Sequence, residues 1–350
     1  MLREALRKVA SGERLTVTEA EEVIGEVMDG RASDAQIAAL LTAMRVRGET
    51  PEEMEGAARA MRRRAARVER KRTPVVDTCG TGGDGAGTFN ISTTAALVVA
   101  GAGQAVAKHG NRSVSSRAGS ADVLEALGVA IDLDAEAAGL CLDEVGIAFL
   151  FAQRLHAAMR HAAGPRRELG FRTIFNVLGP LTNPAGAESQ LVGVYDAALT
   201  EPLAEVLIHL GARHVLVAHS LDGLDELSTS SPARVTEARP GQLRTYVLEP
   251  ERLGLTPAPR SALLGGDARE NAAITEAVLA GEPGPRRETV LLNAAAALAA
   301  ADVVEDLREG LELARRSIDS GAARERLQAL RSFTQELARR RPPAEERRGA

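Results

Sequence analysis

The chain has 350 residues, 45% of them hydrophobic, so it can bury one large core or two of ordinary size. Its formal charge of −5 argues against a general nucleic-acid binder, which needs a basic surface to contact phosphates. No signal peptide opens the chain, and no run of about 18 apolar residues could span a bilayer. The two cysteines, Cys79 and Cys141, provide neither a disulfide framework nor metal-ligand spacing. We therefore expect a cytoplasmic protein without a membrane or nucleic-acid partner.

Residues 1–72 are expected to form a small α-helical domain. Three pairs have the spacing of a capping box, in which Ser or Thr precedes Glu or Gln by three residues: Thr18 with Glu21, Ser33 with Gln36, and Thr50 with Glu53. Apolar residues follow at the spacing of one helix face, as in Ile37, Leu40, Leu41 and Met44. Short helices with one apolar stripe must bury it against each other or against a partner.

From residue 73 to 337 the pattern predicts a large α/β domain. Strands are expected over residues 74–76, 105–107, 147–152, 190–196 and 214–220, and helices over residues 92–103, 120–127, 135–145 and 201–210. Such alternation favours a mostly parallel central sheet covered on both faces. A basic helical stretch near residues 153–185 interrupts it, and residues 239–259 are expected to contain a hairpin. Alanine-rich helices follow, and residues 338–350 are expected to be a disordered tail.

The stretch over residues 77–128 contains two polar, glycine-containing loops, each placed after a predicted strand. The first has glycines at positions 80, 82, 83, 85 and 87 and leads into a helix that starts at Asn90-Ile91-Ser92-Thr93. Inward-turned N–H groups and a helix N-terminus together make a cradle for an anion, most often phosphate. The second loop, from Lys108 to Ser116, leads to another helix start at Gly119-Ser120. An isolated glycine pattern is usually a plain turn, but two such loops on adjacent strands predict a phosphate site.

Asp225 and Glu226 follow the predicted strand over residues 214–220. Adjacent carboxylates at a strand end suit Mg²⁺, a hard cation that prefers oxygen ligands. By spacing alone, an acidic pair in a loop is usually just solvated. The phosphate loop on the same sheet edge favours the metal, because magnesium commonly joins carboxylates to diphosphates.

These motifs resemble those of the anthranilate phosphoribosyltransferase family, most specifically between residues 77 and 231. The matching segments are GTGGD at 80–84, NIST at 90–93, KHGNR at 108–112, GSADVLE at 119–125, RTIFN at 172–176, GPLTNP at 179–184 and LDELS at 224–228. The resemblance implies the two-domain fold shared with nucleoside phosphorylases, with the stretch near 153–185 returning to the helical domain. It also implies transfer of the phosphoribosyl group of 5-phosphoribosyl 1-diphosphate to the amine of anthranilate in tryptophan biosynthesis. A homodimer formed through the helical domain is implied as well.

The resemblance assigns most of these motif residues to ligands. Phosphoribosyl diphosphate is expected to contact Gly80, Gly83, Asp84, Thr88, Asn90, Ile91, Ser92, Thr93, Lys108, His109, Gly110, Asn111, Arg112, Ser113, Val114, Ser115, Ser116 and Ser120. Anthranilate is expected at Gly80, His109, Asn111 and Arg166. Two Mg²⁺ ions are expected, with Glu226 on both, Asp225 on one and Ser92 on the other. A helix-capping role remains the alternative for Ser92. No catalytic acid or base is assigned, because an aromatic amine is neutral and loses its proton only after attack.

The sequence departs from the family at two places near the acceptor site. It has His156-Ala157-Ala158-Met159 where the family often has His-Pro-Ala-Met, and Pro165 where an apolar residue usually precedes the arginine pair. Proline disfavours helix at the residue before it, which leaves open whether Arg166 or Arg167 faces anthranilate. Two alternatives to this function remain: a nucleoside phosphorylase, and a non-catalytic, nucleic-acid-binding relative of the same fold.

Overall fold

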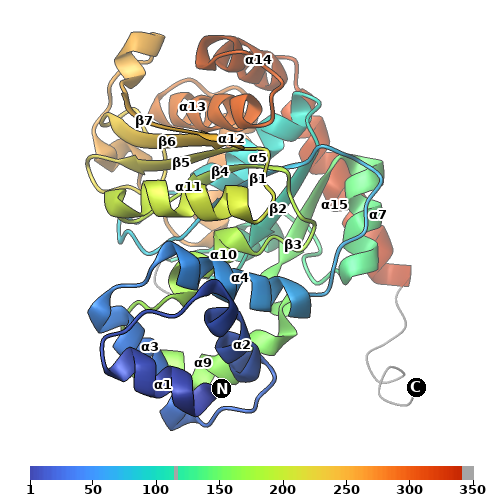
Figure 1. Cartoon of the computed structure of the whole chain (residues 1–350). Coiled ribbons are helices and arrows are strands. Elements are labelled where there is room, and N and C mark those ends of the chain that lie inside the picture. Colours follow the sequence, from blue (N-terminus) through green and yellow to red (C-terminus); the bar gives the residue numbers. More distant parts are fainter. Residues whose placement is uncertain (114–116, 341–350) are drawn as a thin grey trace.

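The computed structural model describes residues 1–113 and 117–340, which form a helical domain below a larger α/β domain (Figure 1). The helical domain contains α1 (Leu2–Ala10), α2 (Val17–Met28), α3 (Asp34–Arg47) and α4 (Pro51–Arg64). A later segment returns to it with α8 (Ala152–Leu155), α9 (Arg160–Leu169) and α10 (Phe175–Leu181). Helix α9 packs against α2 and α3, and α10 packs against α4. The helical domain is therefore built from two separate parts of the sequence.

Two of the three predicted capping boxes are present, and the third is wrong. Ser33 with Gln36 begins α3, and Thr50 with Glu53 begins α4. Helix α2 is capped by Thr16 with Glu19 rather than by Thr18 with Glu21. The sequence offers both spacings two residues apart, and a tertiary contact favours the earlier one. The backbone N–H of the buried Leu15 donates to Glu53 Oε1 at 2.8 Å, which holds the chain immediately before Thr16.

The central sheet has seven strands in the order β3-β2-β1-β4-β5-β6-β7. The strands are β1 (Val76–Gly80), β2 (Val106–Gly110), β3 (Ile147–Phe151), β4 (Ser189–Gly193), β5 (His214–Ser220), β6 (Ala233–Arg239) and β7 (Gln242–Leu248). The first five are parallel, and β6 and β7 form an antiparallel hairpin at one edge. The mostly parallel sheet predicted from the alternating pattern is thus confirmed, while the hairpin begins earlier than predicted.

Strands β1 and β2 extend further toward the site than their apolar runs predict. The apolar runs end at Val76 and Ala107, but the hydrogen-bonded ladder continues to Gly80 and Gly110. Lys108 and His109 consequently lie within β2 rather than in the loop after it. The hydrophobic pattern of a sequence indicates which residues are buried by apolar contacts. How far a strand stays hydrogen-bonded depends on its neighbouring strand as well.

The side chains on the two faces of the sheet belong to two different hydrophobic cores. On one face, Leu191 and Leu216 pack with α5 (Ile91–Gly101) and α13 (Pro285–Ala300). On the other face, Val192, Val215 and Val217 pack with α11 (Thr200–His209) in a cluster that continues into the helical domain. Because side chains of a strand alternate between faces, one sheet holds both cores. The remaining helices are α6 (Ser120–Ala126), α7 (Ala135–Val145), α12 (Ala268–Leu279), α14 (Leu307–Asp319) and α15 (Ala322–Arg340).

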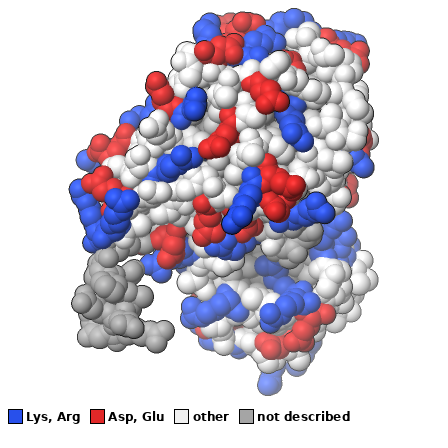
Figure 2. All heavy atoms as spheres, turned by 180° about the vertical axis from the view of Figure 1, so that it is seen from behind, with Lys and Arg blue, Asp and Glu red and all other residues white. Residues whose placement is uncertain are grey.

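Two features concern the molecular surface and the end of the chain. Acidic and basic side chains are interspersed over the face shown in Figure 2. Across residues 1–113 and 117–340, no helix is long and apolar enough to cross a membrane. Helix α15 continues to Arg340, three residues into the predicted tail, and residues 341–350 lie outside the described residues.

The apolar stripe of α3 provides a test of how the helical domain is stabilised. Leu40 and Leu41 are 0% and 1% exposed within the chain's own core, so their burial does not require a second copy. The combined change Leu40→Glu and Leu41→Glu would bury unpaired carboxylates, which costs at least several kcal/mol. We expect unfolding of the helical domain, measured as lost helical circular dichroism. The control Ala39→Glu, at an exposed site on the same helix, should leave the melting temperature within a few degrees. A folded double variant would contradict this account.

Candidate functional site

The candidate site lies at the carboxyl ends of β1, β2, β4 and β5. The chain leaves β1 toward β2 and β3 and later returns to place β4 on the opposite side of β1. Open α/β sheets bind ligands at such a reversal of strand order, because the connecting helices on its two sides diverge. The glycine loop after β1 and the acidic loop after β5 meet here, where Gly82 N–H donates to Asp225 Oδ2 at 2.8 Å.

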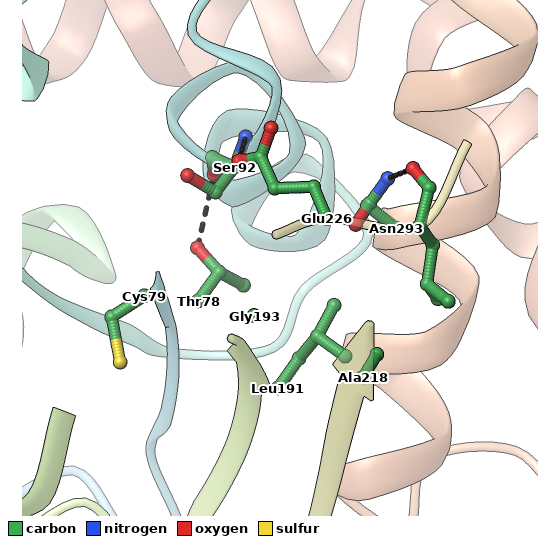
Figure 3. Close-up of a pocket in the computed structure, with 9 residues that line it drawn as sticks. Thr78, Cys79, Ser92, Leu191, Gly193, Ala218, Glu226 and Asn293 are labelled. Carbon is green, nitrogen blue, oxygen red and sulfur yellow. Dashed lines mark hydrogen bonds between the residues drawn. The ribbon is translucent and has the colours of Figure 1, made fainter. Parts of the chain in front are cut away.

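The three residues predicted to bind metal lie together. Glu226 Oε1 accepts the backbone N–H of Ser92 at 2.9 Å, while Asp225 accepts from the glycine loop. Asp84 adds a further carboxylate, because its Oδ2 accepts the N–H of Asp225 at 3.3 Å. Figure 3 shows Glu226 beside Ser92, with Thr78 donating its hydroxyl proton to the Ser92 carbonyl. Asn90 is the N-cap of α5, so the capping role considered for Ser92 is wrong.

Burial and mutual repulsion make the ionised forms of these carboxylates unfavourable when no cation neutralises them. Burial raises the pKa of Asp225 well above its usual value, and the charges of Glu226 and Asp84 raise it further. Burial also raises the pKa of Glu226 to about 7, although hydrogen bonds from Ser92 and the nearby charge of Lys108 oppose that shift. A cation would relieve both effects, because it neutralises charge that water cannot reach.

Lys108 is a buried basic side chain within this acidic region. It is 4% exposed, and its Nζ donates to the Thr78 carbonyl at 2.5 Å. Its charge also opposes the burial-induced rise in the pKa of Asp77, which is fully buried on β1. One ammonium therefore opposes the burial-induced pKa rise of two carboxylates, Asp77 and Glu226. Among the described residues no closed group of three or more His, Cys, Asp or Glu side chains forms a metal site. The surplus carboxylates fit Mg²⁺, which keeps several waters and shares its ligands with substrate phosphates.

The glycine loop adopts backbone angles that other residues rarely reach. Gly82, Gly83, Gly85 and Gly87 have φ of 64°, 79°, 70° and 66°, respectively. Such angles let successive N–H groups turn toward one side, as an anion cradle requires. The Asp84 carboxylate supports the turn by accepting the N–H of Ala86 at 3.0 Å.

A segment that sequence analysis missed braces this loop from the far side. Gly265 N–H donates to the Gly87 carbonyl at 2.9 Å, and Phe89 N–H donates to the Leu263 carbonyl at 3.0 Å. Asn271 of α12 donates to Asn90 Oδ1 at 2.9 Å. Its position in an alanine-rich helix carries no motif, so only the tertiary contact identifies it. Of the predicted phosphate residues at the start of α5, Ile91 and Thr93 are 0% and 1% exposed, and the buried Thr93 hydroxyl has no hydrogen-bond partner among the described residues.

The second loop is held by its own ion pairs. Arg112 contacts Asp122 at 2.7 Å and Glu125 at 2.6 Å, so its guanidinium is already engaged within the chain. Ser120 begins α6 and donates to the Asn111 carbonyl at 3.2 Å. The structure therefore places Gly110, Asn111, Ser113 and Ser120 around one bend, while Val114, Ser115 and Ser116 lie outside the described residues.

The predicted acceptor residues come from both domains. His109 of β2 lies 5.1 Å from His156, measured between ring centroids, and its Nδ1 lies 3.1 Å from the Gly179 carbonyl. Burial, followed by the influence of His156, lowers the pKa of His109 to about 3. The ring is therefore neutral, and donation from Nδ1 to Gly179 leaves Nε2 as an acceptor without a hydrogen-bond partner among the described residues.

Arg166 and Arg167 of α9 differ in their surroundings. Pro165 lies inside α9 without ending it, contrary to the boundary that proline would favour. The Arg166 guanidinium lies over the Phe175 ring, 5.2 Å from its centroid, and burial lowers its pKa. Arg167 is exposed. Of the two, Arg166 is the one with a cation–π contact, to Phe175 at the start of α10.

Comparisons with known proteins agree along nearly the whole chain. The chain matches the Glycosyl transferase family, helical bundle domain, over residues 3–65 and the a/b domain of that family over residues 72–324. An anthranilate phosphoribosyltransferase from Symbiobacterium thermophilum is 61% identical over 332 residues, covering 95% of this chain and 97% of the relative. Another from Pelotomaculum thermopropionicum is 56% identical over 338 residues, covering 97% and 98%.

Solved structures give the same result. The anthranilate phosphoribosyltransferase of Thermus thermophilus superposes with a TM-score of 0.90 at 47% identity, covering 95% of this chain and 99% of that one. The Saccharomyces cerevisiae enzyme in complex with PRPP and Mg has a TM-score of 0.88 at 28% identity, covering 96% and 98%. The same yeast enzyme is also known in complex with 4-fluoroanthranilate.

The raised pKa of Asp225 predicts that this carboxylate destabilises the metal-free protein. A group whose pKa is raised by folding leaves the free energy of unfolding unchanged at pH values below its unfolded pKa, about 3.9. Above that pH it lowers the free energy of unfolding, increasingly until the pH passes the folded pKa. Asp225→Asn retains an oxygen for Gly82 and removes the charge. We expect the variant to gain about 0.5–2 kcal/mol at pH 8 in a chelator, with no gain near pH 4.

Urea denaturation across this pH range measures the effect. Asp29→Asn is a control for which we expect the opposite effect. Arg64 lowers the pKa of Asp29, so removing the charge of Asp29 should destabilise the protein at pH 8. If Asp225→Asn also destabilises the protein at pH 8, the repulsion argument fails.

Proposed function

The chain belongs to the anthranilate phosphoribosyltransferase family, and we propose that it transfers the phosphoribosyl group of 5-phosphoribosyl 1-diphosphate to the amine of anthranilate, releasing pyrophosphate. This reaction forms N-(5-phosphoribosyl)anthranilate in tryptophan biosynthesis. The observation that carries the proposal is the pair of adjacent carboxylates, the buried Asp225 and the half-buried Glu226, directly beside a glycine loop. That pairing suits a magnesium-bound diphosphate better than a single phosphate.

The two loops divide the binding of phosphoribosyl diphosphate between them. In the proposal, N–H groups of Gly83 and its neighbours and the N-terminus of α5 bind the diphosphate, with Asp84, Thr88 and residues 90–93 at its border. Residues 108–113 and Ser120 take the ribose 5-phosphate. Asp225, Glu226 and Ser92 would hold Mg²⁺, for which we propose two ions. Bound there, magnesium offsets the negative charge that develops on the departing pyrophosphate.

Bond exchange takes place at C1 of the ribose. The amine lone pair forms the new C–N bond as the C1–O bond to pyrophosphate breaks, and the bonding electrons leave with that oxygen. The sugar passes through an oxocarbenium-like state, and the extra proton leaves the nitrogen after attack. The chain's contribution is alignment of the amine and stabilisation of the leaving group. A neutral His109 suits this state, because it lines the acceptor side without adding positive charge near the cationic sugar.

Removing both acidic charges tests the metal proposal. Asp225→Asn combined with Glu226→Gln should keep the fold and lower turnover by at least about 10²–10³, the usual loss when a charge-stabilising group is removed from a preorganised site. Anthranilate consumption, followed by its fluorescence with and without Mg²⁺, measures the effect. Near-normal turnover by the double variant would contradict the assignment.

Arg166 tests the acceptor proposal. A guanidinium is suited to bidentate binding of the anthranilate carboxylate, and such a contact contributes about 1.5–3 kcal/mol, or roughly 10- to 150-fold in affinity. Arg166→Ala should raise the anthranilate KM by that range and change the phosphoribosyl diphosphate KM little. Arg167→Ala is the matched control, because that side chain is exposed on the same helix. If neither variant changes anthranilate saturation, other residues bind the acceptor.

Two other functions are separated by the same assay. A nucleoside phosphorylase would use inorganic phosphate and needs no acidic metal pair. A nucleic-acid-binding relative would shift labelled DNA or RNA in a gel without consuming anthranilate. Turnover of anthranilate with phosphoribosyl diphosphate in the presence of Mg²⁺ would exclude both as the main function.

We also propose a cytoplasmic homodimer formed through the helical domain. Support comes from exposed apolar side chains on that domain, Met1 at 55% and Val46 at 83%. The buried stripe of Leu40 and Leu41 is not available to a partner. The free, buried Cys79 and Cys141 suit a reducing compartment. Sedimentation equilibrium at micromolar concentration tests the dimer, which a purely monomeric particle would contradict.

A further inference from the structure

The acidic loop, residues 221–231, needs support from its surroundings to keep its two carboxylates in place. It contains no helix or strand, yet it holds the buried Asp225 and the half-buried Glu226 side by side. Like charges in a low-dielectric site repel strongly, so an unsupported loop would move its carboxylates apart or toward water. Something must hold the backbone against that repulsion while no cation is bound.

Asn293 of α13 contacts this backbone directly after Glu226. Its Nδ2 donates to the Leu227 carbonyl at 2.7 Å and to the Thr289 carbonyl, one turn earlier on its own helix, at 2.9 Å. Only the amide nitrogen can donate to two carbonyls, so the orientation of the side chain is determined. Figure 3 shows Asn293 on the side of the pocket opposite Ser92, with Glu226 between them.

Gly193, the last residue of β4, supports the other side of the loop. A Cβ built there would lie 1.5 Å from the Asp225 carbonyl oxygen and 2.7 Å from its carbonyl carbon. The bare backbone of Gly193 therefore packs against the peptide between Asp225 and Glu226. The Gly193 carbonyl also accepts the N–H of Thr81, which joins this contact to the glycine loop at 2.9 Å.

Asn293 is a polar residue in otherwise apolar surroundings. It is 2% exposed in an alanine-rich helix, and its neighbours Leu292, Ala294 and Ala295 are fully buried. An amide in such a site costs free energy unless it is hydrogen-bonded, and an apolar residue would serve packing alone at least as well. Its contact with the acidic loop is the feature that distinguishes it from a core residue.

We propose that Asn293 and Gly193 are positioning residues that hold Asp225 and Glu226 in the arrangement that binds Mg²⁺ and pyrophosphate. Asn293 fixes the peptide after Leu227, one residue beyond Glu226, and Gly193 fixes the peptide after Asp225. The identity of the ligand rests on the proposed function. The geometry of the support rests on the contacts of the two residues themselves.

The test measures binding rather than turnover. Inorganic pyrophosphate is titrated into the full chain with Mg²⁺ by calorimetry, for the parent, Asn293→Leu and Asn293→Asp. Leucine keeps the volume without a donor, and aspartate keeps the shape but replaces two N–H donors by at most one O–H donor. Each should bind about 10-fold more weakly, equivalent to about 1.4 kcal/mol. The KM for phosphoribosyl diphosphate should rise accordingly, and the KM for anthranilate should stay within about 2-fold.

Two further variants sharpen the result. Leu298→Ala removes a fully buried side chain from the same helix, so it matches the loss of stability without touching the acidic loop. Its pyrophosphate affinity should equal that of the parent. Gly193→Ala must displace the Asp225 carbonyl and should weaken binding at least as much as Asn293→Leu. Asn293→Asp supplies the same comparison if Asn293→Leu does not fold.

The outcomes separate this inference from the proposed function. If the Asn293 variants bind as the parent does, or if Leu298→Ala loses as much affinity, the positioning role is overturned while the function stands. If the parent binds neither pyrophosphate with Mg²⁺ nor anthranilate, the proposed function fails instead.

Discussion

Electrostatic repulsion among buried carboxylates is the constraint around which this site is built. Asp225 is buried and Glu226 is half-buried beside Asp84, and burial raises the pKa of both Asp225 and Glu226. The surrounding contacts are arranged to tolerate this charge: backbone N–H groups of Gly82 and Ser92 donate to the two carboxylates. The chain thus keeps an unfavourable charge that a bound cation would relieve, which is typical of a site organised for binding rather than for stability.

The sheet topology explains how distant segments reach this point. The glycine loop follows β1, the acidic loop follows β5, and β4 lies between those strands. Gly193 at the end of β4 has no side chain, so the two loops can meet over it. The helical domain is not an independent lobe, because its core is continuous with the α11 face of the sheet. The site is therefore bordered by two parts of the chain that share one hydrophobic cluster.

Motif reasoning succeeded where chemistry is local and was incomplete where it depends on contact. The glycine loop, the acidic pair and the mostly parallel sheet were all predictable, because backbone freedom, charge and periodicity are readable from neighbouring residues. Lys108 was predicted to lie in the loop after its strand. It lies within β2 instead, because the pairing of β2 with β3 continues after the apolar run ends. The cap of α2 was shifted by two residues, since the contact between Leu15 and Glu53 joins residues 38 positions apart.

The sequence by itself determined the class of fold, the phosphate-type loops and the presence of a paired carboxylate. These follow from residue types and short spacings, which act through local backbone geometry and burial. Only the tertiary structure decided that Arg166 is half-buried over Phe175 while Arg167 is exposed, because a proline within α9 leaves both registers open in the sequence. It alone revealed Asn271 and Asn293, whose importance lies in single hydrogen bonds across long separations. Such bonds depend on how helices pack against the sheet, and no local pattern encodes that packing.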